Sequence, residues 1–216
     1  MNRFPERLAD DRTADASETR PPAEAARPRT AGPGAADEGP ERGDTSGTRM
    51  LPAFAALLAG ELVRRAEEDT RVTRQAQADP GTRARRAVLE RRGANAVALE
   101  AIVRRHGWPA ADQVGAEAST AALMILLHTP DLDFQLLCRD LIAQAVADGR
   151  CPPAQHAYIA DHCAVELGEP QFYGTRVNPV TLRPYALRRP GTVDERRRDV
   201  GLCPLDEQMR ALRERG

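Results

Sequence analysis

Large aliphatic residues are almost absent from the first 48 positions of this 216-residue chain and recur at helical spacing after them. In residues 1–48, which mix Pro, Gly, Ala, Arg, Asp and Glu without a period, Leu8 is the only large aliphatic residue. Such a segment buries too little apolar surface to offset the chain entropy that it would lose on folding. We therefore predict a disordered tail over residues 1–48 and a single helical domain over residues 50–216.

The rest of the chain carries Ala, Leu, Val and Ile in stripes with residues three and four apart, which is the period of an amphipathic helix. Aromatic residues make up only 4% of the chain, so the core must use small aliphatic side chains, which suits closely packed helices. Proline and glycine mark the points where helices stop. We expect helices over about residues 50–79, 82–105, 116–128, 131–148, 153–167, 193–200 and 204–213.

Residues 169–190 break this pattern. Pro170, Pro179, Pro184 and Pro190 exclude any long helix, while the apolar residues between them could form short extended pieces. The predicted fold class is therefore mainly α. We expect a compact helical bundle of about six to seven helices with one irregular or short β-hairpin segment near 170–190.

Opposite charges balance almost completely. The chain has 31 basic residues, all of them arginine, and 32 acidic residues, for a net charge of −1. This near-neutrality argues against general nucleic-acid binding and against binding to a membrane surface. The absence of lysine is typical of a GC-rich genome, and the alternative is selection of arginine for bidentate contacts with carboxylates or phosphates.

The N-terminal residues lack the apolar stretch of a signal peptide, and no apolar run approaches the roughly 18 residues of a membrane span. The four cysteines form no C-x-x-C pair. We therefore expect a cytoplasmic protein with reduced thiols, no membrane association and no metal site. The cofactor is unknown, and the expected partner is an unknown small molecule or protein.

The chain contains no Walker loop, no dinucleotide fingerprint, no H-E-x-x-H and no G-x-S-x-G motif. It offers scattered polar residues instead. The only tryptophan, Trp108, lies in the series His106-Gly107-Trp108-Pro109 at the end of a predicted helix. One interpretation is a helix stop whose tryptophan fills the core. The other is a pocket wall, with Trp108 as the apolar face and His106 as the titrating group.

His128 follows an apolar helix and lies on its last turn. An imidazole at that place can interact with the last carbonyl groups of the helix, which is a structural role. It can also serve as a general acid or base, because free imidazole titrates near neutral pH, although the sequence does not reveal its partner.

The series Gln171-Phe172-Tyr173-Gly174-Thr175 lies in the non-helical stretch. It is either a tight turn with Gly174 at positive φ or a site where hydroxyl and backbone N–H groups hold a polar ligand. Downstream, Asp194 and Arg198 can pair on the solvated face of a short helix. In the functional interpretation, an arginine of that helix binds a carboxylate in a pocket instead.

These pieces occur in a fixed order along the chain, and the ordered series resembles a known family. The series is His106-Gly107-Trp108-Pro109, Val114-Gly115, an Ala-rich helix ending at His128, Tyr158 and Asp161, Gln171 to Thr175, Val193 to Arg197, and Gly201-Leu202. It is similar to the bacterial family catalogued as domain of unknown function 6624, over about residues 55–210. The resemblance implies a compact domain with its motif residues drawn together, and it implies no activity because no reaction is assigned to that family.

The sequence departs from the family pattern at two places. Arg91, Arg92 and Gly93 occupy a stretch before Asn95 where members often carry an acidic residue. His162 stands where members often have arginine. If these positions shape the site, the departures predict a specialised or impaired copy.

Two hypotheses of different classes follow. In the first, the chain is a small-molecule or peptide-binding enzyme with a polar pocket, using acid–base or hydrolytic chemistry. The expected catalytic residues are His128, His106, Asp161 and Tyr173, and the expected ligand-binding residues are Trp108, Gln171, Gly174, Thr175, Asp194 and Arg197. In the second, it is a non-catalytic interaction, accessory or immunity-type module. Convergence of His128, Tyr173 and Arg197 in one concave pocket would favour the first hypothesis, and scattering of the three would favour the second.

Overall fold

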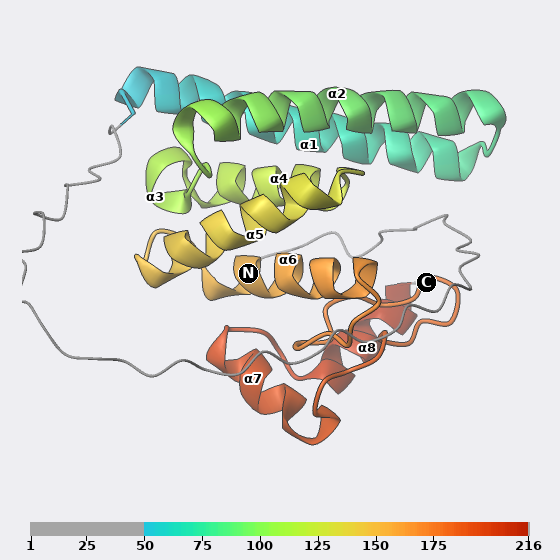
Figure 1. The fold of residues 1–216 in the computed structure, drawn as a ribbon. Helices are drawn as coiled ribbons and strands as arrows, with labels where there is room; N and C mark the ends of the chain where they lie inside the picture. The colour runs from blue at the N-terminus through green and yellow to red at the C-terminus, as the bar shows by residue number, and fades with distance from the viewer. Residues whose placement is uncertain (1–49, 216) are drawn as a thin grey trace, which may run out of the picture. The chain divides into compact units, whose positions relative to one another are not determined.

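The structure is a computed structural model that describes residues 50–215 (Figure 1), and the tail predicted over residues 1–48 lies outside them. The described residues form eight α-helices, one 3₁₀ turn and no sheet, which confirms the mainly α fold class. The helices are α1 (Pro52–Ala78), α2 (Thr82–His106), α3 (Ala111–Val114), α4 (Ala116–Leu127), α5 (Leu132–Ala147), α6 (Pro153–Glu166), α7 (Val193–Asp199) and α8 (Leu205–Arg215), with η1 at Pro190–Thr192. Within residues 50–215, no helix is long and apolar enough to cross a membrane.

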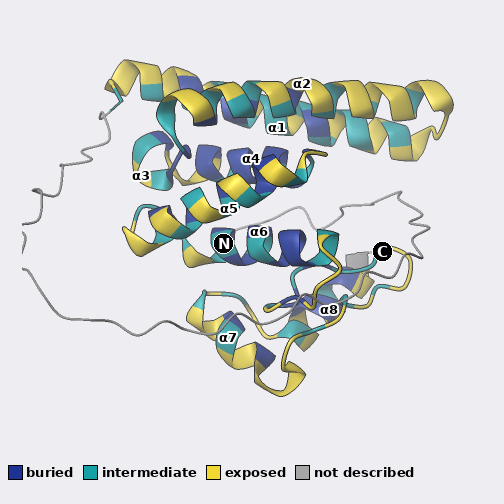
Figure 2. Cartoon of the chain, viewed as in Figure 1, coloured by how far each residue is buried: buried dark blue, intermediate teal, exposed yellow. Residues whose placement is uncertain are grey.

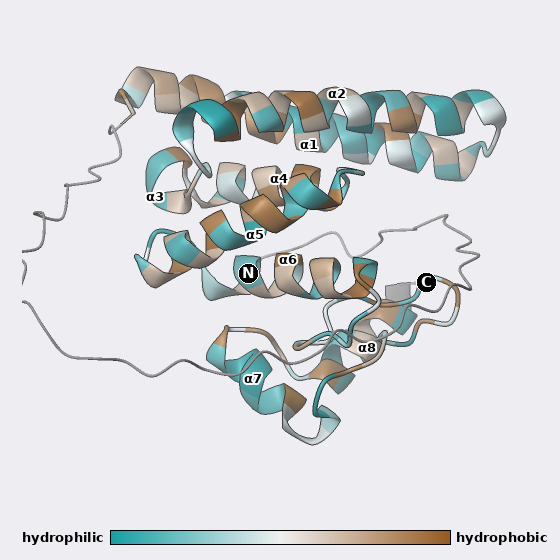
Figure 3. Cartoon of the chain, viewed as in Figure 1, coloured by the Kyte–Doolittle hydropathy of each residue, from teal (hydrophilic) through white to brown (hydrophobic). Residues whose placement is uncertain are grey.

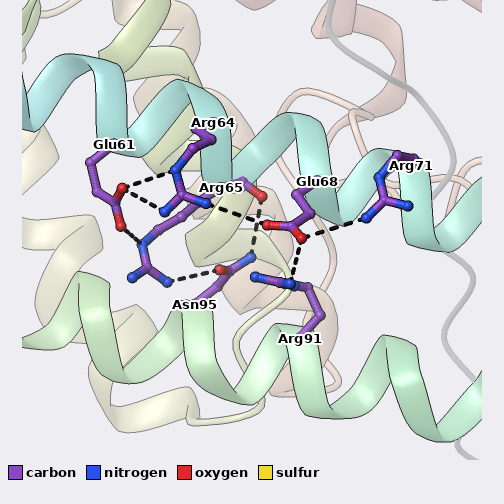
Figure 4. A network of polar contacts seen from close by, with 7 residues as sticks. All are labelled: Glu61, Arg64, Arg65, Glu68, Arg71, Arg91 and Asn95. Carbon is purple, nitrogen blue, oxygen red and sulfur yellow. Dashed lines mark hydrogen bonds and ion pairs between the residues drawn. The ribbon is translucent and has the colours of Figure 1, made fainter.

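Helices α1 and α2 form a long antiparallel pair joined by the turn at residues 79–81 (Figure 1). Charged side chains connect the two helices (Figure 4), because Glu68 accepts from Arg91 at 2.6 Å and Asn95 accepts from Arg65 at 3.3 Å. Gly107 ends α2 with φ of +73°, as the predicted glycine stop requires.

Helix α4 is the most enclosed long helix, with eight of its twelve residues buried (Figure 2). Its small and aliphatic side chains allow α1, α2 and α6 to pack closely around it. Trp108 joins this core with only 4% of its surface exposed. The short α3 precedes α4, and Gly115 between them has a φ of +85° that favours glycine.

Helices α5 and α6 pack against each other, and α6 also packs against α4. Asp131 caps α5, since its carboxylate accepts from the N–H of Phe134 at 3.0 Å. Proline opens α6 at its first turn, where the missing N–H costs nothing.

The short β-hairpin predicted near 170–190 is wrong, and the irregular alternative describes this segment. Two isolated bridges, Gln171 with Leu187 and Val177 with Pro184, replace a ladder among the described residues. Proline lacks the N–H that a ladder would need. The side chain of Asn178 also caps a local turn by accepting from two backbone N–H groups, which removes them from strand pairing.

Helices α7 and α8 follow this segment and contact each other. Helix α7 is short and mostly hydrophilic (Figure 3). Two of its side chains are buried, Arg197 completely and Val193 with 7% of its surface exposed. The Asp194 carboxylate accepts from the N–H of Leu205 at 2.8 Å and so satisfies a donor in the first turn of α8.

Candidate functional site

A cavity of about 550 Å³ forms a groove between α1 and α4. Its apolar wall consists of Val63 and Ala66 from α1 with Ala121, Met124 and Ile125 from α4. Nine polar residues also line it, namely Glu67, Asp69, Thr70, Arg71, Arg74, Gln75, Glu117, Thr120 and His128. Ligand sites combine apolar surface with polar groups that fix the orientation of a ligand.

Asp69 and His128 form a close pair at this cavity. The Nδ1 atom of His128 lies 2.8 Å from Oδ2 of Asp69, and the two side chains are 13% and 6% exposed. The other ring nitrogen, Nε2, is buried and has no hydrogen-bond partner among the described residues. A carboxylate so close to Nδ1 favours the tautomer that carries its proton on Nδ1, and that tautomer has its lone pair at Nε2.

The position of Asp69 follows from the helical period of α1. It lies on the same stripe as the buried Leu58 and Leu62, so α1 must carry its carboxylate into the helix packing. Arg92 of α2 approaches from the other side, with Nε 3.7 Å from Oδ1 of Asp69. Sequence reasoning missed Asp69, and its signal was a charged residue in phase with an apolar stripe.

The arrangement has the elements of an oriented base. A carboxylate that accepts from one imidazole nitrogen holds the ring in one tautomer and stabilises the imidazolium that forms when the other nitrogen takes a proton. His128 is held at the end of α4, and Asp69 is held within α1. Both groups are therefore placed by rigid helices rather than by a loop.

A second polar group surrounds Asp161 of α6, which is fully buried. Its carboxylate accepts from the N–H of Phe172 at 2.7 Å, of Tyr173 at 3.0 Å and of Thr175 at 2.9 Å. The Thr175 hydroxyl donates to it as well, at 3.0 Å. Burial raises the pKa of Asp161, and the N–H groups of Thr175, Tyr173 and Phe172 act in the opposite direction.

Arginines of α7 hold the carbonyl side of the same loop. The fully buried Arg197 donates from Nη1 to the carbonyl of Tyr173 and from Nε to that of Cys203, both at 2.6 Å, and also to the side chain of Gln208. Arg196 donates from Nε to the carbonyl of Phe172 at 2.9 Å. The loop is thus clamped between a carboxylate on its N–H side and two guanidinium groups on its carbonyl side.

Gln171 and Gly174 belong to this clamp. The buried Gln171 amide donates to the carbonyls of Arg176 and Tyr185 at 2.9 and 3.1 Å and accepts from the N–H of Arg176 at 3.0 Å. Gly174 has a φ of +71°, and a Cβ there would lie 3.0 Å from a methyl carbon of Leu205. The structure therefore brings together six predicted site residues, namely Asp161, Gln171, Tyr173, Gly174, Thr175 and Arg197.

A model of the family of unknown function DUF6624 matches residues 58–215. The chain belongs to this family. The resemblance carried by the ordered motif series is thereby confirmed. No curated protein and no solved structure matches the chain. Since the DUF6624 description carries no reaction, the chemistry of this member has to be argued from its own geometry.

The predicted site residues of this DUF6624 member do not form one site. Of the three residues whose convergence was a criterion, His128 lines the α1–α4 cavity, while Tyr173 and Arg197 do not, and this result favours the interaction-module hypothesis. Burial raises the pKa of the Tyr173 phenol, so the phenol is a neutral hydrogen-bonding group at neutral pH. A role for Tyr173 and Arg197 in binding a ligand stays a prediction.

The remaining predicted residues lie elsewhere. His106 packs its ring against Phe54, with ring centroids 5.0 Å apart. Trp108 is buried in the core, and its Nε1 has no hydrogen-bond partner among the described residues. Asp194 lies on α7, where it satisfies the first turn of α8. None of the three lines the α1–α4 cavity.

The thiols differ sharply in their surroundings. Burial raises the pKa of Cys138 to about 12 and that of Cys163 to about 11, so neither forms a thiolate nucleophile at neutral pH. Cys203 is exposed, and only its backbone carbonyl contacts Arg197. Within residues 50–215, no three His, Cys, Asp or Glu side chains gather in a way that could hold a metal ion.

Proposed function

We propose that the groove between α1 and α4 binds a small molecule or peptide and that His128 serves there as a general base. The observation that carries this proposal is the imidazole itself, whose Nδ1 lies 2.8 Å from Oδ2 of Asp69 and whose Nε2 has no hydrogen-bond partner among the described residues. Buried polar atoms normally have hydrogen-bond partners. A ligand group or a ligand-bound water at Nε2 supplies the missing partner.

The chemistry follows from the two ring nitrogens. Nε2 takes a proton from a ligand group or from an attacking water, and Asp69 stabilises the imidazolium that results. The same nitrogen then returns the proton to the leaving group. Acid–base and hydrolytic reactions share this sequence, and neither needs a nucleophilic cysteine. Because Nε2 is buried, we expect ligand binding to displace groove side chains such as Met124 as the ring becomes accessible.

The test is turnover by the full chain in a bacterial metabolite and peptide extract, followed by mass spectrometry. Wild-type protein and the His106→Asn control should deplete the same component. His128→Asn should slow that depletion by about 10²–10⁴-fold, the usual contribution of a general base. Equal depletion by the His128→Asn and wild-type proteins, or no depletion by the wild type, would overturn the proposal.

The second candidate is a non-catalytic interaction module, and exposed apolar residues at the start of α1 favour it. Leu51 and Leu57 are each 75% exposed and Phe54 is 42% exposed. Three large apolar residues within about two helical turns of each other are normally covered by other residues or by a partner. Sedimentation of the full chain tests this. A concentration-dependent association that Leu51→Ser and Leu57→Ser abolish, together with no turnover by the wild type, would make this the function.

A further inference from the structure

Charged side chains along the α1–α4 groove are sorted by sign. Helices α1 and α4 run in the same direction (Figure 1), and the Asp69–His128 contact aligns the middle of α1 with the end of α4. Glu117 lines the groove in the first turn of α4. Arg74 lines it on α1 beyond the level at which α4 ends. One end of the groove is therefore acidic and the other basic.

Glu67 and Arg71 complete this arrangement on α1. Glu67 lies on the Glu117 side of Asp69, and Arg71 lies on the Arg74 side. Arg71 is partly engaged by Gln75 at 3.4 Å and Glu68 at 3.5 Å, and Figure 4 shows it facing Glu68. Within the described part of the chain, Glu67, Glu117 and Arg74 form no ion pair or side-chain hydrogen bond. Their charges are therefore available to a ligand.

Helix geometry sets the spacing of these charges. At 1.5 Å per residue, Glu67 and Arg74 are about 10 Å apart along α1. Glu117 lies about 16 Å before His128 along α4, so it is roughly 13 Å farther out than Glu67 and beyond the reach of the same terminal amine. A chain in extended conformation advances about 3.3 Å per residue, so three or four amino acids cover a distance of roughly 10–13 Å. On α4, Ala121, Met124 and Ile125 form the apolar wall of the groove between Glu117 and His128.

We propose that the occupant of the groove is a short linear peptide with both ends free. Its amine lies at Glu67, its carboxylate lies at Arg74 and Arg71, and its backbone passes His128. This inference rests on the proposed function for the location of the site and adds the class of ligand. A peptide with either end blocked loses one ion pair, and a longer protein segment offers neither terminal charge within the groove.

The experiment is an NMR titration of the ¹⁵N-labelled full chain with tetra-alanine, its N-acetylated form and its C-amidated form. Tetra-alanine should shift backbone signals of α1 and α4. Acetylation and amidation should each raise Kd by about fivefold at low salt, the scale of one exposed ion pair, and the difference should shrink as salt increases.

Two variants assign each end. In Glu67→Gln the acetylated and free peptides should bind equally, while amidation still weakens binding. In Arg74→Gln the pattern should reverse. Glu207→Gln on α8 and Arg83→Gln on α2 are exposed charge-removal controls outside the groove, and both should keep the wild-type pattern. Equal binding of all three peptides to the wild type, or no shifts from any of them, would overturn the inference.

The failure of this inference is distinguishable from that of the proposed function. His128→Asn should bind tetra-alanine within about twofold of wild type, because the terminal charges are untouched. If peptide binding depends on the free ends but His128→Asn does not change turnover, the inference is supported and the proposal that His128 is a general base is contradicted. If turnover depends on His128 but peptide binding does not depend on the free ends, the inference is contradicted and the proposed general base is supported.

Discussion

Two clusters of polar side chains, one around Asp161 and Arg197 and one around Asp69 and His128, differ in whether their polar atoms have hydrogen-bond partners. The Asp161 carboxylate accepts hydrogen bonds from backbone N–H groups, and the Arg197 guanidinium donates hydrogen bonds to backbone carbonyls. Around Asp69 and His128, one imidazole nitrogen and one carboxylate oxygen lack hydrogen-bond partners among the described residues, and a cavity adjoins them.

The difference teaches how to separate a structural carboxylate from a candidate functional one. Burial alone does not decide, because Asp161 is 0% exposed and Asp69 is only 4% exposed. What distinguishes them is the number of partners, since a saturated group has no capacity left for a ligand. We therefore expect substitutions in the loop clamp to reduce stability and substitutions at the groove to change binding and chemistry.

Arg197→Met should give the largest effect on stability. Methionine fills much of the volume but leaves the carbonyls of Tyr173 and Cys203 and the side chain of Gln208 without their donor. We expect a loss of about 3–5 kcal/mol in the free energy of unfolding. Chemical denaturation beside Arg198→Met, an exposed neighbour on α7, measures it. A loss equal to that of the control would show that the clamp is not saturated in solution.

Carboxylate-to-amide exchange compares the two groups directly. In Asp161→Asn an NH₂ group faces backbone N–H donors, so we expect a loss of about 3 kcal/mol in the free energy of unfolding. In Asp69→Asn the remaining carbonyl oxygen still accepts from His128, so the loss should be only about 1 kcal/mol. Turnover should nevertheless fall in Asp69→Asn, because the imidazolium loses its counter-charge. Equal losses of stability would break the comparison.

Gly174→Ala tests the clamp through its backbone. A φ of +71° strains an alanine, and the new methyl group would press against Leu205. We expect a loss of about 2 kcal/mol in the free energy of unfolding. Gly93→Ala in the middle of α2 is the matched control, because a methyl group added there would meet no atom within 4 Å. That variant should gain roughly 0.5–1 kcal/mol from helix propensity.

The smallest effect concerns His156, a partly buried residue of α6. Burial and the neighbouring Arg139 lower the pKa of His156 below its ordinary value of 6.5. A histidine with a lowered folded-state pKa destabilises the fold as pH falls through 6.5, because the unfolded chain takes up the proton first. His156→Gln should therefore flatten the pH dependence of stability between about pH 7.5 and 5.5. An unchanged slope would assign it to another group.

Sequence analysis predicted most of the helices, because helix stops and caps depend on neighbours in the chain. Gly107 is an example in which a residue type and its position suffice. The four-residue α3 was not expected, since so short an apolar pattern carries no period. The hairpin was wrong because alternation cannot reveal side chains that take over backbone hydrogen bonds, as Gln171 and Asn178 do.

For the site, the sequence by itself determined the type of residue at each position, including a histidine at the end of an apolar helix and an arginine as the fifth residue of α7. Only the tertiary structure decided that Asp69 pairs with His128 and that Arg197 is enclosed by protein carbonyls. The physical reason is that satisfaction of a buried polar group depends on atoms brought from distant parts of the chain. Helical period places a side chain on a face, and the packing of helices then determines which partner it meets there.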